Sequence, residues 1–231
     1  MECLYAPELR AGIKTVNISD YDEVRHTKAL RLRKGERAML TNGCGLCAIA
    51  ALNCSASNSA SFTVLEELPD FGETGRRLGL ALGILDSRDR MEFAVEKAVE
   101  LGITDFFPLI CERSQRKTAS TERLNAKILA AVKQCRRAVL PALHAAVGIS
   151  GFIAHSATDF KSFILADADG KPPTSVADSA VIIVGPEGGF SAHEIAIINT
   201  GAAHLQRLSL APRRLRAETA AIAALAVINR Y

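Results

Sequence analysis

The sequence predicts an α/β fold in which a small, β-rich N-terminal domain precedes a larger domain built on a parallel sheet. Beyond residue 77, apolar runs alternate with amphipathic segments, as expected for strands joined by crossover helices. Before residue 70, short apolar runs are separated by turn residues, which is typical of antiparallel strands. We place the domains at residues 1–70 and 74–231, with a linker candidate at 69–75.

The composition is that of an ordinary globular protein. The chain has 231 residues, 48% of them hydrophobic, and a net charge of +3. It contains no uninterrupted apolar run of the roughly 18 residues that a membrane-spanning helix needs. The N-terminus, with Glu2 and Pro7, lacks the basic start and apolar middle of a signal peptide. We therefore expect a cytoplasmic protein without membrane association, whose six cysteines are reduced thiols.

The N-terminal domain is expected to hold one helix and several short strands. The helix spans 19–30, with Ser19 as its N-cap and acidic residues in its first turn. Strand candidates follow at 37–41, 46–52 and 62–68. Asn42-Gly43 is a strong hairpin signal between the first two of these strands.

The second domain is expected to alternate strands with helices. Gly102 ends the first helix, and Ser191 caps a later one through capping-box spacing to Glu194. The predicted strands lie at 78–85, 104–110, 162–166, 180–184 and 204–209, and the predicted helices at 91–101, 121–138, 192–201 and 217–229.

The most informative segment is the glycine-rich loop 185–189, Gly-Pro-Glu-Gly-Gly, between a buried strand and a capped helix. Glycines allow a ligand to approach the backbone closely. The segment lacks the Lys-Ser/Thr of a phosphate-binding loop, and Glu187 would repel a phosphate. A neutral or cationic ligand therefore fits better, although a tight turn without a ligand is the simpler alternative.

A second loop, 210–216, is rich in arginine and leads into a helix whose first turn holds Glu218. Loops that follow parallel strands emerge at the same, carboxyl, edge of a sheet, so we expect the two loops to form one cleft. The simpler alternatives are surface arginines and an acid that only complements the helix dipole.

Basic residues gather in three segments. Residues 25–37 contain six Lys/Arg, residues 113–137 contain eight and residues 207–216 contain four. Such patches supply the phosphate contacts that dominate nucleic-acid affinity, although any one of them could be a solvated face. Together they favour RNA or DNA as a partner.

Two further motifs have competing interpretations. Residues 43–48 satisfy the G-x-G-x-x-A dinucleotide fingerprint, but only a short helix could follow them, and Asn42-Gly43 favours a hairpin. Cys44 and Cys47 have C-x-x-C spacing, yet the chain has no second such pair. We expect no dinucleotide site and no metal.

Segments 91–102, 112–114, 185–189 and 215–220 occur in the order found in the bacterial ribosomal small-subunit RNA uridine-N3 methyltransferases, which the chain resembles over nearly its whole length. Residues 26–33 also resemble a helix in the N-terminal domain of that family. The glycine-rich loop alone would indicate only the wider SPOUT superfamily.

This resemblance implies a C-terminal trefoil knot, a PUA-like RNA-binding N-terminal domain, S-adenosyl-L-methionine as cofactor and a homodimer. It also implies small-subunit ribosomal RNA as the partner, within the assembled 30S subunit. By position, it assigns cofactor binding to Leu165, Gly185, Pro186, Glu187, Gly188, Leu210, Arg213 and Leu215. The RNA-binding candidates are His26, Arg31, Arg33 and Arg113.

For catalysis we expect Arg216 to stabilise negative charge on the uracil oxygens, while Glu218 or a water that it orients accepts the N3 proton. Two residues depart from the family pattern, Lys133 and Ala211. Ala211 favours an alternative, an RNA-binding ribosome-assembly factor whose cofactor pocket has decayed. A nicotinamide-dependent oxidoreductase that uses the Gly43 loop is a third possibility.

Overall fold

A computed structural model of the chain describes residues 1–171 and 176–229, and the chain divides into two compact units. The first comprises Met1–Thr74 with Leu129–Leu140, and the second comprises Gly75–Ile128 with Pro141–Tyr231. The segment 129–140 therefore packs with the first unit, whereas we expected it within the domain at 74–231. Its place depends on long-range contacts that local patterns do not encode.

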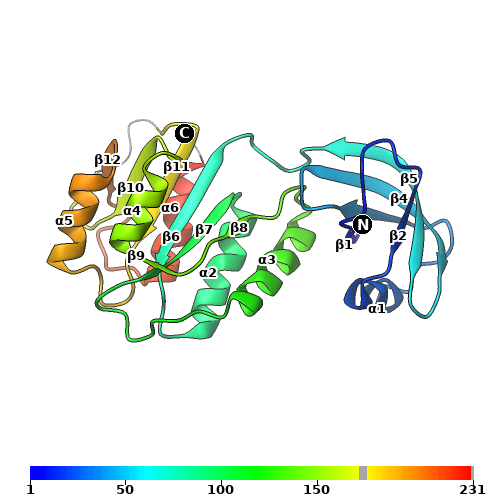
Figure 1. Ribbon diagram of the computed structural model, residues 1–231, viewed down its shortest axis with the longest axis horizontal. Helices are drawn as coiled ribbons and strands as arrows, with labels where there is room; N and C mark the ends of the chain where they lie inside the picture. The colour runs from blue at the N-terminus through cyan, green and yellow to red at the C-terminus, as the bar shows by residue number, and fades with distance from the viewer. Residues whose placement is uncertain (172–175, 230–231) are drawn as a thin grey trace. The chain divides into compact units, whose positions relative to one another are not determined.

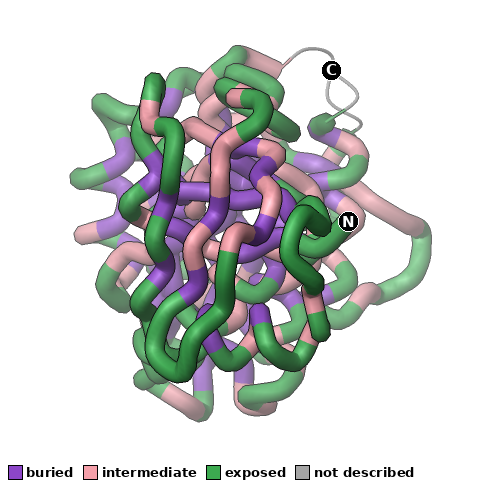
Figure 2. Tube along the Cα trace, turned by 90° about the vertical axis from the view of Figure 1, so that its right-hand side faces the viewer, coloured by how far each residue is buried: buried purple, intermediate pink, exposed green. Residues whose placement is uncertain are grey.

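The first unit is built on a five-stranded sheet of order β1-β3-β4-β5-β2, in which β1 pairs in parallel with β3 and the other pairs are antiparallel. Buried positions alternate with more exposed ones along β2 and β4. Figure 2 shows buried and exposed positions following one another along the chain segments that face the viewer. Phe62 and Leu40 are fully buried and belong to the hydrophobic core of this unit. The elements are β1 (Cys3–Tyr5), β2 (Thr15–Ile18), α1 (Tyr21–Ala29), β3 (Arg37–Thr41), β4 (Leu46–Ser55) and β5 (Ala60–Pro69).

The turn between β3 and β4 is the predicted hairpin. Gly43 and Gly45 have positive φ angles of 71° and 100°, and the Asn42 side-chain oxygen accepts hydrogen bonds from the Cys44 and Leu46 amides. The residues after the glycines continue as an antiparallel strand rather than a helix. The fingerprint at 43–48 therefore lacks the strand–turn–helix setting that dinucleotide binding requires.

Helix α1 begins one residue later than predicted. Its N-cap is Asp20, not Ser19, and the Asp20 carboxylate accepts a hydrogen bond from the Glu23 amide at 3.0 Å. Strands β1 and β2 were not predicted, because segments of three and four residues are too short to show a clear period.

Lys133, one of the two departures from the family pattern, has a partner in the first unit. Its ammonium group pairs with the carboxylate of Glu23, which is buried and also accepts a hydrogen bond from the Tyr5 amide. A buried carboxylate needs such a counter-charge. Lys133 belongs to α3 (Thr121–Cys135), which ends three residues earlier than predicted because Arg136 has a φ of 61°.

The second unit is an α/β structure on a parallel sheet of order β12-β10-β11-β6-β7-β8, with β9 also paired to β7 (Figure 1). Side chains on one sheet face, including Val181 and Ile183, pack with α4 and α5. Helices α2 and α6 pack together, and α6 contacts β6, β10 and β11. The strands are β6 (Arg77–Gly83), β7 (Asp105–Ile110), β8 (Ala142–Leu143), β9 (Val147–Gly148), β10 (Ser162–Ala166), β11 (Ser179–Val184) and β12 (Leu205–Leu208).

The predicted helices of this unit are present, and one more was missed. The helices are α2 (Arg88–Glu100), α4 (Ile149–Ser156), α5 (Ala192–Gly201) and α6 (Ala217–Ile228). Helix α4 was not predicted, because it has only eight residues, contains Gly151 and has no side-chain cap. Strand β6 ends two residues before the predicted limit. In the described part of the chain, no helix is long and apolar enough to cross a bilayer.

Candidate functional site

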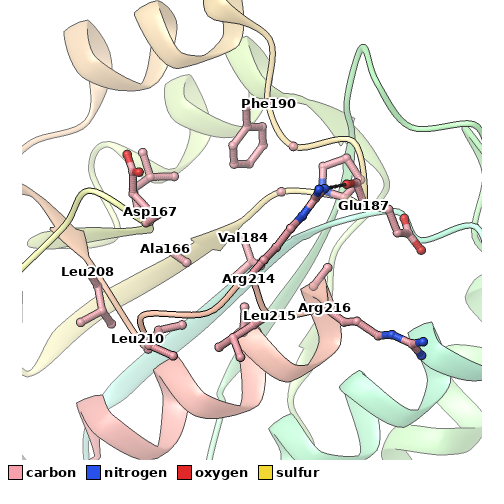
Figure 3. Close-up of a pocket in the computed structure, with 18 of the residues that line it drawn as sticks. Ala166, Asp167, Val184, Glu187, Phe190, Leu208, Leu210, Arg214, Leu215 and Arg216 are labelled. Carbon is pink, nitrogen blue, oxygen red and sulfur yellow. Dashed lines mark hydrogen bonds between the residues drawn. The ribbon is translucent and has the colours of Figure 1, made fainter.

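Three loops at the carboxyl edge of the parallel sheet line one cavity of about 770 Å³ in the second unit (Figure 3). The three loops follow β10, β11 and β12, and we call the space between them the three-loop cavity. We expected the loops after β11 and β12 to meet, and both line the cavity. The strands themselves are not neighbours, because β10 lies between them. The loops still share an edge because all three strands are parallel.

The glycine-rich loop is a compact turn fixed by its own backbone. The Gly189 amide donates to the Pro186 carbonyl at 2.8 Å, and Gly189 has a φ of 67°, which favours glycine. The predicted capping box follows: the Ser191 hydroxyl accepts from the Glu194 amide, and the Glu194 carboxylate accepts from the Ser191 amide. The loop is thereby held in one conformation between β11 and α5.

The sequence suggested that the carboxylate of Glu187 carries a negative charge without a partner. In the structure, this carboxylate has a cationic partner. The Arg90 guanidinium lies 3.0 Å from one Glu187 oxygen, and the Asp86 amide donates to the same oxygen at 3.3 Å. The negative charge that we expected to face a ligand is therefore largely neutralised by Arg90.

The arginine-rich loop crosses toward the glycine-rich loop through Arg214. Its guanidinium donates to the Glu187 carbonyl at 3.1 Å (Figure 3). Arg216 is the N-cap residue of α6, and its exposed side chain points away from Leu210 and Leu215 (Figure 3). The Arg216 guanidinium therefore lies at the rim of the cavity, away from its apolar part, where it can contact a ligand.

Glu218 lies in the first turn of α6 and is buried. One of its carboxylate oxygens, Oε2, has no hydrogen-bond partner among the described residues, and the Arg90 guanidinium lies 3.7 Å from it. A buried carboxylate in this state retains the capacity to accept a hydrogen bond or a proton. Arg90 therefore contacts one acidic residue in the glycine-rich loop and another in the first turn of α6.

Most residues predicted to bind a cofactor lie around this one cavity. The cofactor-binding candidates that line it are Leu165, Gly185, Pro186, Glu187, Leu210, Arg213 and Leu215, and the catalytic candidate Arg216 lines it as well. Gly188 and Glu218 are adjacent to lining residues but do not line the cavity. The Gly188 carbonyl instead accepts a hydrogen bond from Arg113 at 3.3 Å.

The residues predicted to bind RNA are distributed over both units. His26, Arg31 and Arg33 belong to the first unit, and Arg113 belongs to the second. Arg31, Arg33 and Arg113 are exposed, whereas His26 is half-buried and lies 3.9 Å from the Glu23 carboxylate. Their roles stay predictions.

Several residues that line the cavity were not predicted. Asp167 follows β10, and its carboxylate pairs with Arg207; Phe190 follows the glycine-rich loop. Position directly after a predicted strand would have indicated Asp167, and adjacency to the glycines would have indicated Phe190. Arg90 gave no such signal, because it lies about a hundred residues earlier, in the first turn of α2.

No group of three His, Cys, Asp or Glu side chains is arranged to hold a metal within residues 1–171 and 176–229. Of the C-x-x-C pair, Cys44 is exposed and Cys47 is buried. Burial raises the pKa of the Cys47 thiol, which keeps it protonated.

Comparisons with known proteins identify the family to which the chain belongs. A family model described as an RNA methyltransferase domain matches residues 73–229. Ribosomal RNA small subunit methyltransferase E from Synechocystis sp. is 31% identical, with 87% of this chain and 68% of that protein covered. The chain belongs to the ribosomal RNA small subunit methyltransferase E family.

Two other family members cover almost the whole chain. The methyltransferase E of Rickettsia conorii is 29% identical over 98% of this chain and 94% of its own length. The crystal structure of the methyltransferase E from Neisseria gonorrhoeae bound to S-adenosyl methionine has a TM-score of 0.90. It is 28% identical and covers 100% of this chain and 97% of that one.

Proposed function

We propose that this protein transfers a methyl group from S-adenosyl-L-methionine to N3 of a uridine in small-subunit (16S) ribosomal RNA. The observation that carries the proposal is the convergence of the glycine-rich and arginine-rich loops on one cavity, in a chain of the methyltransferase E family. The reaction class and the cofactor follow from the family. The N3 position follows from the resemblance of the sequence motifs.

The three-loop cavity fits the proposed cofactor. Its volume of about 770 Å³ lies within the range of small-molecule sites. Leu165, Leu210, Leu215 and Phe190 offer an apolar surface for the adenine ring, and Asp167 offers carboxylate oxygens to hydroxyl or ammonium groups. Gly185 lets the glycine-rich loop pack closely on itself, since an added Cβ would lie 3.3 Å from Gly189 and Phe190. Cofactor roles for Pro186, Glu187, Gly188 and Arg213 belong to the same proposal.

When bound, S-adenosylmethionine supplies a methyl group that its sulfonium already activates, so the protein contributes mainly orientation and charge stabilisation. Glu218 accepts the uracil N3 proton on its carboxylate, directly or through a water that it orients. Arg216 stabilises the negative charge that then spreads over the uracil oxygens. Arg90 holds Glu218 and Glu187 beside the cavity.

The first unit serves RNA binding in this proposal, as a PUA-like domain at residues 1–70 with His26, Arg31 and Arg33 as contacts. The methyltransferase domain at 74–231 carries the trefoil knot of the SPOUT superfamily and contributes Arg113. We further propose that the protein acts as a homodimer in the cytoplasm, on the assembled 30S subunit.

Labelled methyl transfer to 30S particles from a strain that lacks the enzyme tests the function, with mapping of the modified base. A modified uridine N3 is expected. Calorimetry with S-adenosylmethionine separates an enzyme from an assembly factor with a decayed pocket, since only the enzyme should bind the cofactor saturably. Absence of both binding and transfer would favour the assembly factor.

The residue roles are tested by single-turnover rates. Glu218→Gln and Arg216→Ala should each lower the rate of methyl transfer about 100-fold with little change in cofactor affinity. Lys161→Ala, a loss of one exposed charge away from the three-loop cavity, is the matched control. Unchanged rates in both variants would eliminate the assignment.

A further inference from the structure

A second cavity, of about 360 Å³, lies beside the first turn of α2 in the second unit. Arg88, Met91 and Glu92 line it and share one face of the helix, since residues three and four apart lie together. Arg90 points from a different face of the same turn and lines the three-loop cavity. One helical turn therefore contributes to both cavities.

This second cavity has an apolar floor and a cationic rim. Ile84, Leu85, Met91 and Leu124 are buried and form the floor. Among the other lining residues are three arginines, one carboxylate and two side chains with hydroxyl groups. They are Arg88, Arg116, Arg123, Glu92, Thr118 and Ser120, and we call the site the arginine cavity.

The arginines of the rim keep donors for a ligand. Arg123 donates through Nε to Glu92 at 2.7 Å, and Arg116 donates through Nη1 to the Asp86 carbonyl at 3.4 Å. A guanidinium has five N–H donors, so one such bond leaves most of them available. Three guanidiniums against one carboxylate give the rim a positive balance, which suits a phosphate.

We propose that the arginine cavity binds one nucleotide of the substrate RNA next to the methylated uridine. The arginines contact its phosphate, and the apolar floor receives its ribose and base. This inference rests on the proposed function, because it places the RNA strand beside the three-loop cavity. Because the rim arginines contact the phosphate in this proposal, they position the RNA backbone, and such contacts carry no sequence information directly.

The binding test uses an RNA fragment that contains the methylated uridine, with Arg88→Gln, Arg116→Gln and the double variant. Each lost phosphate contact should weaken RNA binding about fivefold at 0.1 M salt and reduce the slope of log affinity against log salt by about 0.7. S-adenosylmethionine affinity should not change. Lys97→Gln removes one charge from the same helix without lining either cavity and should bind RNA normally.

A cross-link tests the location. Thr118 is exposed and lines the cavity, so Thr118→Cys can carry a photo-crosslinker in a chain in which the exposed Cys44 and Cys54 are replaced by serine. The cross-link should map to a nucleotide adjacent to the methylated uridine. A map to distant nucleotides would overturn the proposal.

Two further outcomes separate the hypotheses. Arginine variants that keep both the wild-type affinity and the wild-type salt slope would overturn the inference, as would tighter binding of free uridine monophosphate than of the RNA fragment. If the wild-type protein fails to methylate 30S particles, the proposed function fails instead. In that case, a difference in affinity for 16S RNA between the wild type and the arginine variants would still report on the cavity.

Discussion

Arg90 connects the glycine-rich loop to the first turn of α6 through a single guanidinium. It lies 3.0 Å from a Glu187 oxygen and 3.7 Å from Glu218 Oε2. Glu218 is buried, so the loss of its nearby cation would leave a poorly compensated charge. We therefore regard Arg90 as a positioning residue of the site.

A double-mutant cycle measures this connection. Arg90→Gln and Glu218→Gln should be non-additive in the free energy of unfolding, with a coupling of about 1 kcal/mol, because each removes the partner of the other. Urea unfolding provides the measurement. A cycle of Arg90→Gln with Glu100→Gln should be additive within about 0.5 kcal/mol. Equal coupling in the two cycles would contradict a specific contact.

At the scale of elements, the site depends on the close approach of the glycine-rich loop to β6. A Cβ at Gly83, the last residue of β6, would lie 2.4 Å from the Pro186 nitrogen, which is closer than real atoms come. Glycine at this position therefore lets the loop pack directly on the strand end. The packing of two elements distant in sequence determines the shape of the cavity.

We expect Gly83→Ala to cost about 1–3 kcal/mol of stability, because neither backbone can yield without moving its element. Displacement of Pro186 should also weaken S-adenosylmethionine binding. Calorimetry and urea unfolding measure the two effects. Gly148→Ala is the control, since its nearest non-neighbouring atom would lie at 4.0 Å. Normal cofactor affinity in Gly83→Ala would show that the loop does not need this contact.

Another element-scale feature involves Asp105, the first residue of β7. Its buried carboxylate accepts hydrogen bonds from Arg77 of β6 and from Thr104, and His144 lies 2.9 Å away. Burial alone would raise the pKa of this carboxyl, but the bonds from Arg77, His144 and Thr104 outweigh it and lower the pKa.

This lowered pKa predicts an acid-dependent stability. Because the folded-state pKa of Asp105 lies below the unfolded-state pKa, its contribution is complete above the unfolded value and is lost as the pH falls through the folded value. Asp105→Asn should be less stable at pH 7 and should lose less stability than the wild type on acidification. Unfolding free energies at pH 7, 5, 4 and 3 measure this. Parallel pH curves for the two proteins would contradict it.

At the scale of the whole molecule, the two units differ in the type of sheet, and only one of them holds the two cavities described above. The first holds a mixed, mainly antiparallel sheet and the second holds a parallel sheet with both cavities. A ligand of the three-loop cavity binds groups of the second unit alone. The bound ligand should therefore stabilise the second unit more than the first.

Hydrogen exchange with and without S-adenosylmethionine tests this inequality. At a cofactor concentration 100 times the Kd, protection within residues 185–190 and 210–216 should rise by up to about 100-fold, which corresponds to about 2.7 kcal/mol. Exchange in β3 and β4 should change little. Protection of similar size in both units, or none in the two loops, would argue against cofactor binding in this cavity.

Local patterns in the chain were sufficient to predict the α/β class, most elements of the second unit, the β3–β4 hairpin and the two loops of the site. These depend on local signals: apolar periodicity, caps, glycines and turn residues. Short elements such as β1, β2 and α4 lacked enough residues to show a period.

Features that depend on neighbours distant in the chain became visible only in the folded molecule. The insertion of β10 between β11 and β12, the packing of 129–140 with the first unit, and the contacts of Arg90 all join segments far apart in sequence. Local propensity contains no information on such pairs, because their energy arises only when the chain is folded.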